Sequence, residues 1–148
     1  MAVDHGAFIE RLFAAMNRQD LALVDEFFTA DVVVDYPQSG EEIRGRHNFR
    51  AVLENYPGTI EGESTTLRVA ATDELRVVAP LFKVVSVEGA GNAGTYYGRS
   101  RYPDGTIWWV VGLYQLRDGR IGRSTIFFAQ EFEAPEWRAP YVTRVKPD

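Results

Sequence analysis

The chain has 148 residues, a formal net charge of −5, a hydrophobic fraction of 45% and no cysteine. This length fits a single domain with a buried core, and the composition is that of a folded globular protein. The negative charge disfavours nucleic acid and anionic membrane surfaces as partners, and the lack of cysteine excludes disulfides and thiolate metal sites. No apolar run is long enough to span a membrane.

Two helices are expected at the start of the chain. Asp4 is a suitable N-cap, and apolar residues then recur at helical spacing over residues 8–16. Asp20 can cap a second, shorter helix, whose apolar face would include Phe27 and Phe28. The first ten residues carry two acids where a signal peptide would have bases followed by an apolar run, so we expect a cytoplasmic protein.

Residues 31–58 form the stretch around which the rest of the fold is expected to close. It reads as a strand over residues 32–36, a polar turn over 37–40 and a short second strand over 42–44. An amphipathic helix over 46–56 follows and is stopped by a Pro-Gly pair. With the first two, this gives three helices that each need to bury one face against a sheet.

The second half of the chain supplies that sheet. Turn residues separate five runs rich in β-branched and aromatic residues, at 65–72, 75–88, 95–102, 106–117 and 121–132. Because the connections are short, neighbouring strands should be antiparallel. The fold class is therefore α+β: a cone-shaped α+β barrel with three N-terminal helices packed on a curved, mostly antiparallel sheet of about six strands.

One domain is expected to span residues 1–148. The segment 134–148 is too rich in proline for a regular element. Its two large aromatic residues, Trp137 and Tyr141, predict a packed irregular tail rather than a free one.

Within the run at 106–117, both alternating faces are bulky. Trp108, Val110 and Tyr114 share one face, on which Gly112 leaves a gap. The opposite face carries Ile107, Trp109, Val111 and Leu113. Since a solvated face would be polar, we expect the first face to line the interior and the second to be covered by another subunit in a homodimer. The C-terminal tail is an alternative cover for part of the second face.

The glycines of residues 89–94 spell GxGxxG, the spacing of a dinucleotide-binding loop. That motif cradles a pyrophosphate only when a helix follows it, and here the sequence continues as a strand. We therefore interpret it as a hairpin loop.

The order of these elements resembles the nuclear transport factor 2-like superfamily, and within it the SnoaL-like group, over residues 7–133. The motifs that carry the resemblance are ERLFAAMNRQDL, VDYP followed by IRGR, and LRDGRIGR. The superfamily includes ketosteroid isomerases, polyketide cyclases, limonene epoxide hydrolases and dehydratases, as well as members that only bind a ligand or a protein. The resemblance thus implies an enclosed apolar pocket but leaves its use open.

The end of the first strand is where the resemblance places the polar groups of the pocket. Ketosteroid isomerases have an aspartate directly before a proline there; here Tyr36 precedes Pro37, and the acid is Asp35. Because adjacent strand residues face opposite ways, both can line the pocket only if the strand bulges. Asp35 is either a base or an acceptor that holds the turn, and Tyr36 is either a donor to a ligand oxygen or a core residue. His47 is a third catalytic candidate or a solvated residue.

We expect a pocket for a small apolar or aromatic molecule, lined by Tyr36, Tyr56, Trp108, Val110, Tyr114, Ile126 and Phe128. An enzyme of this kind would run cofactor-free acid/base chemistry, namely isomerisation, cyclisation, dehydration or hydrolysis of a polyketide-, terpene- or steroid-like substrate. The alternative is a non-catalytic binding or dimerisation module. We expect His5 at the surface, and two isolated histidines predict no metal site.

Overall fold

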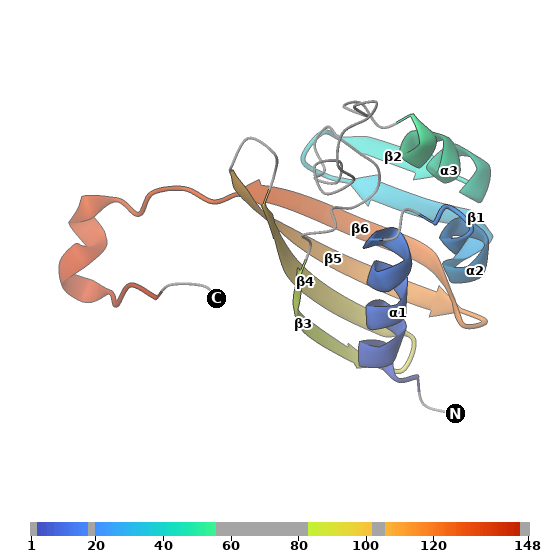
Figure 1. Cartoon of the computed structure of the whole chain (residues 1–148), viewed down its shortest axis with the longest axis horizontal. Coiled ribbons are helices and arrows are strands. Elements are labelled where there is room, and N and C mark those ends of the chain that lie inside the picture. Colours follow the sequence, from blue (N-terminus) through green and yellow to red (C-terminus); the bar gives the residue numbers. More distant parts are fainter. Residues whose placement is uncertain (1–2, 18–19, 56–82, 102–105, 146–148) are drawn as a thin grey trace.

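The computed structural model of the chain describes residues 3–17, 20–55, 83–101 and 106–145. Within these residues, three α-helices cover one face of a six-stranded sheet of order β2-β1-β6-β5-β4-β3 (Figure 1). The helices are α1 (His5–Asn17), α2 (Leu23–Phe27) and α3 (Arg46–Glu54), and a 3-10 helix, η2 (Glu136–Tyr141), follows the sheet. The strands are β1 (Phe28–Tyr36), β2 (Glu41–Arg44), β3 (Lys83–Ala90), β4 (Ala93–Arg101), β5 (Ile107–Arg117) and β6 (Arg120–Gln130).

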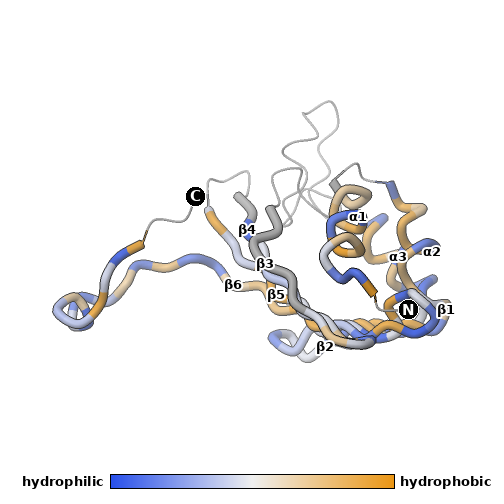
Figure 2. The backbone as a smooth tube through the Cα atoms, turned by 90° about the horizontal axis from the view of Figure 1, so that it is seen from below, coloured by the Kyte–Doolittle hydropathy of each residue, from blue (hydrophilic) through white to orange (hydrophobic). Residues whose placement is uncertain are grey.

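The sheet is curved and mostly antiparallel. β1 pairs in parallel with β6, and every other neighbouring pair is antiparallel. Figure 2 shows the curved sheet from its edge, with the three helices on one side of it. The α+β class and the curved sheet predicted from the sequence are confirmed.

The hairpin between β3 and β4 accounts for the GxGxxG spacing. Its tight turn contains Gly91, whose positive φ of 59° is one that glycine adopts without strain. The turn is followed by β4 and not by a helix, which confirms the hairpin interpretation.

The N-terminal half shows where helix and strand boundaries differ from expectation. The Asp4 carboxylate accepts a hydrogen bond from the Ala7 amide at 2.9 Å, as expected of an N-cap. Phe28 was assigned to the second helix, but it begins β1, because the chain becomes extended there at the end of α2. α3 ends at Glu54. Tyr56, the run at 65–72 and the first part of the run at 75–88 lie outside the described residues.

The core lies between the helices and the face of the sheet that we call the inner face. α1 contributes Phe8, Ile9 and Leu12 to it, and the other helices contribute five further buried side chains. From the sheet, the inner face presents Val32, Val34 and Tyr36 of β1, Tyr96 of β4, Trp108, Val110 and Tyr114 of β5, and Ile126 and Phe128 of β6. We call the opposite side, which carries Asp35, Trp109 and Val111, the outer face.

Residues 131–145 form a C-terminal arm that runs away from the end of β6 (Figure 1). The sequence predicted a packed, irregular tail. Instead, six residues of the arm form η2, and Trp137 and Tyr141 are 74% and 82% exposed. The prediction of packing is corrected for the single chain, because none of the described residues covers these aromatic side chains.

Candidate functional site

The two faces of β5 differ in burial as their sequence alternation predicted. Val110 and Tyr114 are only 5% and 2% exposed, whereas Val111 and Leu113 on the outer face are 39% and 43% exposed. The predicted assignment of the strand to an interior and an exterior face is therefore confirmed.

At one end of the inner face, the side chains are only partly buried. Tyr36 ends β1, Trp108 is the second residue of β5, and Ile126 and Phe128 lie near the end of β6. The Tyr36 and Phe128 rings meet edge to face, with centroids 5.9 Å apart. These four residues define the open end of the inner face, and they are four of the seven predicted pocket residues.

A glutamine holds the rim of the open end together. The Gln38 side chain, in the turn after β1, donates from Nε2 to the Phe128 carbonyl at 2.6 Å. Its Oε1 accepts from the Phe128 amide at 2.5 Å. The side-chain amide thus takes the place of a strand backbone and ties the β1–β2 turn to β6. This residue was not predicted, because its role depends on a partner 90 residues away.

Burial raises the pKa of the Tyr36 phenol to about 12, and the charge of Glu41 contributes to the rise. The phenol is therefore neutral at pH 7 and can donate a hydrogen bond. Within the described parts of the chain, its hydroxyl has no hydrogen-bond partner.

Glu41 is the carboxylate that shares the inner face with Tyr36. The two residues are directly opposite in the β1–β2 pair, and opposed residues of an antiparallel pair have Cβ atoms about 5 Å apart on the same face. Glu41 lies on the edge strand and is exposed. Glu41 was not predicted, because residue 41 fell between the predicted turn at 37–40 and the predicted strand at 42–44, although β2 starts there.

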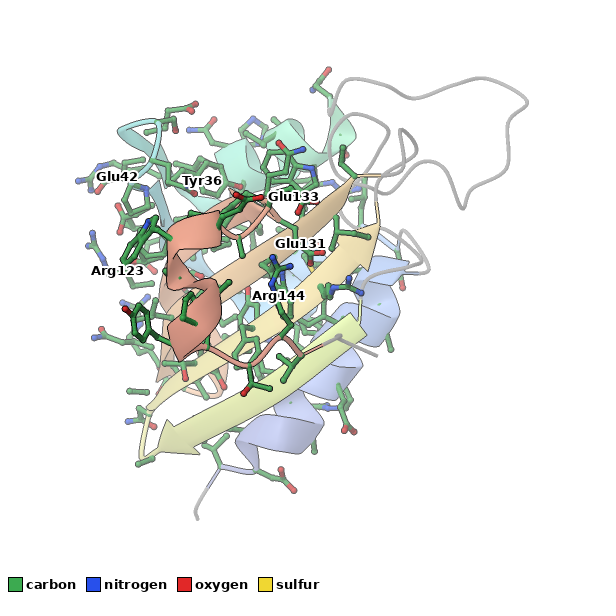
Figure 3. The ribbon with its side chains drawn as sticks, turned by 90° about the vertical axis from the view of Figure 1, so that its left-hand side faces the viewer. Tyr36, Glu42, Arg123, Glu131, Glu133 and Arg144 are labelled. Atoms are coloured by element: carbon green, nitrogen blue, oxygen red, sulfur yellow. The ribbon has the colours of Figure 1, made fainter. Side chains whose placement is uncertain are left out.

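Asp35 lies on the outer face. Its Oδ2 accepts a hydrogen bond from Arg123 Nη2 at 2.7 Å, and Arg123 also approaches Glu42 at 3.6 Å (Figure 3). β1 has no bulge between residues 33 and 35, so the alternation of the strand holds. This placement removes Asp35 from the inner site and makes it part of a surface ion-pair group.

Two further predicted site residues, His47 and Tyr56, are not placed at the open end. His47 is exposed in the first turn of α3, which begins beside Val33 rather than Tyr36. Three strand residues separate those two positions, about 10 Å along the strand. Tyr56 lies outside the described residues, so its predicted place in the pocket stays a prediction.

The opposite, closed end of the inner face contains a buried histidine. His5 was expected at the surface, but it is buried at the start of α1. Its Nε2 donates to the Gly91 carbonyl at 3.0 Å, so in the neutral ring Nδ1 accepts from the Tyr114 hydroxyl at 2.8 Å. The expectation is corrected: the imidazole connects α1 to β5 and to the β3–β4 turn.

Two glycines make room for the tyrosine rings of the closed end. Tyr96 lies over Gly112 on β5, and Tyr114 lies over Gly94 on β4, so each ring covers the glycine opposite it. A Cβ atom at either glycine would approach the ring to less than 3.0 Å. Burial raises the pKa of both phenols, that of Tyr114 to about 12.

Two features of the described residues concern metals and membranes. Among the described residues, no group of three or more metal-ligating side chains could hold a metal ion. In the same part of the chain, no helix is long and apolar enough to cross a membrane.

Comparison with known families gives a match to the SnoaL-like domain over residues 9–124. The chain belongs to the SnoaL-like domain family. A comparison of this SnoaL-like chain with curated proteins finds no match. The open end described above therefore has to be interpreted from its own chemistry.

Solved structures of the nuclear transport factor 2-like fold resemble the SnoaL-like chain over most of its length. One is an NTF-2 like protein of unknown function from Burkholderia xenovorans LB400, with TM-score 0.70 and 26% identity, covering 96% of this chain and 98% of its own. A proposed ketosteroid isomerase from Kribbella flavida DSM 17836 has TM-score 0.73 and 20% identity, covering 96% and 90%. IdmH, a proposed polyketide cyclase from Streptomyces antibioticus, has TM-score 0.60 and 18% identity, covering 85% and 92%.

Proposed function

We propose that this SnoaL-like chain binds a small, largely apolar or aromatic molecule at the open end of its inner face, and that Tyr36 donates a hydrogen bond to an oxygen of that molecule. The supporting observation is a neutral phenol that contacts the Phe128 ring, which is 37% exposed, at the same end of the inner face as the partly buried Trp108 and Ile126. Apolar walls with one or two placed polar groups are typical of small-molecule sites. The similarity to a proposed ketosteroid isomerase and a proposed polyketide cyclase agrees with a ligand of this class.

Two neighbouring tryptophans provide the first test, because Trp108 faces inward and Trp109 outward. We expect 2-acetylnaphthalene to quench the tryptophan fluorescence of the wild type. The Trp108→Phe variant should lose most of this change, and the Trp109→Phe variant should keep it. Quenching that depends on Trp109 and not on Trp108 would place the ligand on the outer face and contradict the proposal.

A matched pair of probes tests the donor. 2-Ethylnaphthalene has nearly the shape of 2-acetylnaphthalene but lacks its carbonyl. One hydrogen bond contributes about 0.5–1.5 kcal/mol net, so Tyr36→Phe should weaken binding of the ketone by about 2–10-fold and leave binding of the hydrocarbon unchanged. An equal loss for both probes, measured by the same titration, would show that Tyr36 acts by shape alone.

The pairing of Tyr36 with Glu41 supports a second candidate function, proton abstraction next to a carbonyl. Glu41 would take the proton from carbon, and Tyr36 would donate a hydrogen bond to the enolate oxygen. We expect exchange of the acetyl protons of 2-acetylnaphthalene in D₂O, followed by NMR. Replacing a positioned base typically slows such a step by about 10²–10⁴-fold, so Glu41→Gln should abolish the exchange, whereas Asp35→Asn on the outer face should not.

If the wild type binds 2-acetylnaphthalene but does not exchange its acetyl protons, the protein is a non-catalytic binding module. In that case, Glu41→Gln should leave the affinity for both naphthalene probes nearly unchanged, since its carboxylate would touch no reacting atom.

The outer face supports a further part of the proposal, a homodimer. Val111 and Leu113 are exposed side by side with Trp109, and a contiguous apolar strip of this kind is rarely left in water. We infer that a second copy covers this face, as the sequence pattern of Ile107, Trp109, Val111 and Leu113 indicated.

A further inference from the structure

The C-terminal arm exposes large apolar side chains along its whole length. Phe132, Trp137, Tyr141 and Val145 each have more than 70% of their surface in contact with solvent. Four such residues within 14 positions form a segment far more apolar than an ordinary exposed terminus. The arm therefore has the composition of a buried element but is not buried by its own chain.

η2, at the middle of the arm, is too short to be stable alone. It has six residues, and isolated helical segments of this length do not persist in water. Within it, the Arg138 guanidinium lies over the Trp137 ring, 5.7 Å from its centroid. A surface that covers Trp137 and Tyr141 would supply the missing stabilisation.

Like the arm, the outer face carries a cluster of aromatic and arginine side chains. Trp109 Nε1 donates to Glu131 Oε2 at 3.1 Å, and Arg99 Nε forms an ion pair with the same oxygen at 3.3 Å. The Arg99 guanidinium also lies 5.7 Å from the Trp109 ring, and the Tyr97 ring is 6.1 Å from it. Clusters of Trp, Tyr and Arg with fixed side chains are typical of the energetic centre of protein interfaces.

The same cluster fixes the direction in which the arm leaves. Glu131 is the first residue of the arm, and its amide donates to the Ile107 carbonyl at 2.8 Å. Viewed onto the outer face, the arm, with Glu133 and Arg144, stands in front of β4, β5 and β6 (Figure 3). Figure 1 shows from the side that it stands away from them. The apolar side chains of the arm are therefore left exposed, although the arm stands in front of the outer face.

We propose that the arm is exchanged between two copies of this chain, so that the arm of each protomer lies against its partner. This inference rests on the homodimer of the proposed function and adds the element that holds it together. The outward-facing residues of β4, β5 and β6 together with the arm make about 30 residues, the upper end of one side of a standard interface. In a two-fold dimer each protomer supplies one arm and receives one, so the exposed apolar groups of both arms and of both outer faces are covered.

The first experiment measures the dimer dissociation constant by sedimentation at several concentrations. We expect the wild type to be a dimer at micromolar concentration. The double variant Trp137→Ser/Tyr141→Ser, which keeps the length of the arm, should raise the dissociation constant at least tenfold. Trp109→Glu on the outer face should give monomers, whereas Val52→Ser, which changes an exposed apolar residue of α3, should have no effect. Circular dichroism of each variant shows that the fold is retained.

The second experiment distinguishes exchange from folding back onto the same chain. Trp137 is replaced by the photo-cross-linker p-benzoylphenylalanine, and ¹⁵N-labelled and unlabelled proteins are mixed before irradiation. Exchange predicts cross-linked peptides that join one heavy and one light chain.

The outcomes separate the two proposals. A monomeric wild type overturns both the dimer and the arm exchange. A dimer whose dissociation constant is unchanged by Trp137→Ser/Tyr141→Ser, or whose cross-links join only residues of one chain, keeps the sheet-mediated dimer and overturns the exchange. A tenfold weaker dimer together with mixed heavy and light cross-links establishes it.

Discussion

The two ends of the inner face are built from the same strands but differ in how their polar groups are used. At the closed end, the Tyr114 hydroxyl is bound by His5, and both tyrosine rings fill the space left by glycines. At the open end, the pKa of the Tyr36 phenol is raised as much as that of Tyr114, but no described residue binds its hydroxyl. A phenol that is satisfied within the fold contributes stability, and one that is not is available for a ligand.

The largest expected effect concerns the glycines of the closed end. In Gly112→Ala, the new Cβ would meet the Tyr96 ring at less than 3.0 Å, so the ring and β5 have to separate. Overpacking of this kind costs about 3 kcal/mol in the free energy of unfolding, measured by urea denaturation. Gly122→Ala is the control, because its nearest contact would be an ordinary 3.6 Å to Arg117 Cβ. Similar stability of the two variants would mean that Tyr96 is loosely held.

An intermediate effect compares the two phenols directly. Tyr114→Phe leaves a buried His5 nitrogen without its donor, which should cost about 1–3 kcal/mol of unfolding free energy. Tyr36→Phe removes a hydroxyl that no described residue binds, so we expect a change within about 0.5 kcal/mol. Thermal or urea unfolding of both variants at pH 7 measures the difference. If Tyr36→Phe destabilised the chain as much as Tyr114→Phe, the two ends would not differ as we describe.

The smallest expected effect appears in alkali. The folded pKa of Tyr36 and that of Tyr114 are both raised from 10.0 to about 12, so these phenols keep their protons after the unfolded chain has lost them. Stability should therefore be independent of these groups below pH 10 and fall as the pH rises from 10 to 12. At pH 11 the loss is about 1.4 kcal/mol for each phenol.

The variants Tyr36→Phe and Tyr114→Phe test this dependence of stability on pH. In each, the free energy of unfolding should fall less between pH 10 and pH 12 than in the wild type. At pH 7, Tyr36→Phe should be as stable as the wild type, whereas Tyr114→Phe should already be less stable. Unfolding midpoints at pH 8 and pH 11 are sufficient to compare them. An unchanged slope in both variants would mean that other groups govern alkaline unfolding.

The faces of the strands could be predicted because alternation is a local property. The bulky pattern of β5 placed Val110 inside and Val111 outside, and the same rule predicted that Asp35 and Tyr36 would face opposite ways. The rule could not say which of the two faced inward, since that depends on the pairing of β1 with β6.

The residues that were missed depend on long-range contacts or on a boundary. His5 looked like a surface residue because its partner, Tyr114, is 109 residues away. Glu41 was left just outside the predicted strand at 42–44, and a shift of one residue in the start of β2 places it opposite Tyr36 on the inner face. The aromatic residues of the arm predicted a packed tail, whereas Trp137 and Tyr141 are exposed in the single chain, because a sequence does not state what a terminal segment packs against.

The parallel pairing of β1 with β6 has a consequence for how the protein is made. Asp35 is opposite Thr125, so β1 finds its central neighbour only when about 90 further residues have been synthesised. At about 5–20 residues per second, this wait lasts about 5–20 s, during which the N-terminal helices and the β1–β2 hairpin have no sheet to cover their apolar faces. The nascent chain should therefore depend on holding chaperones until β6 has left the ribosome, and fragments that stop before β6 should aggregate.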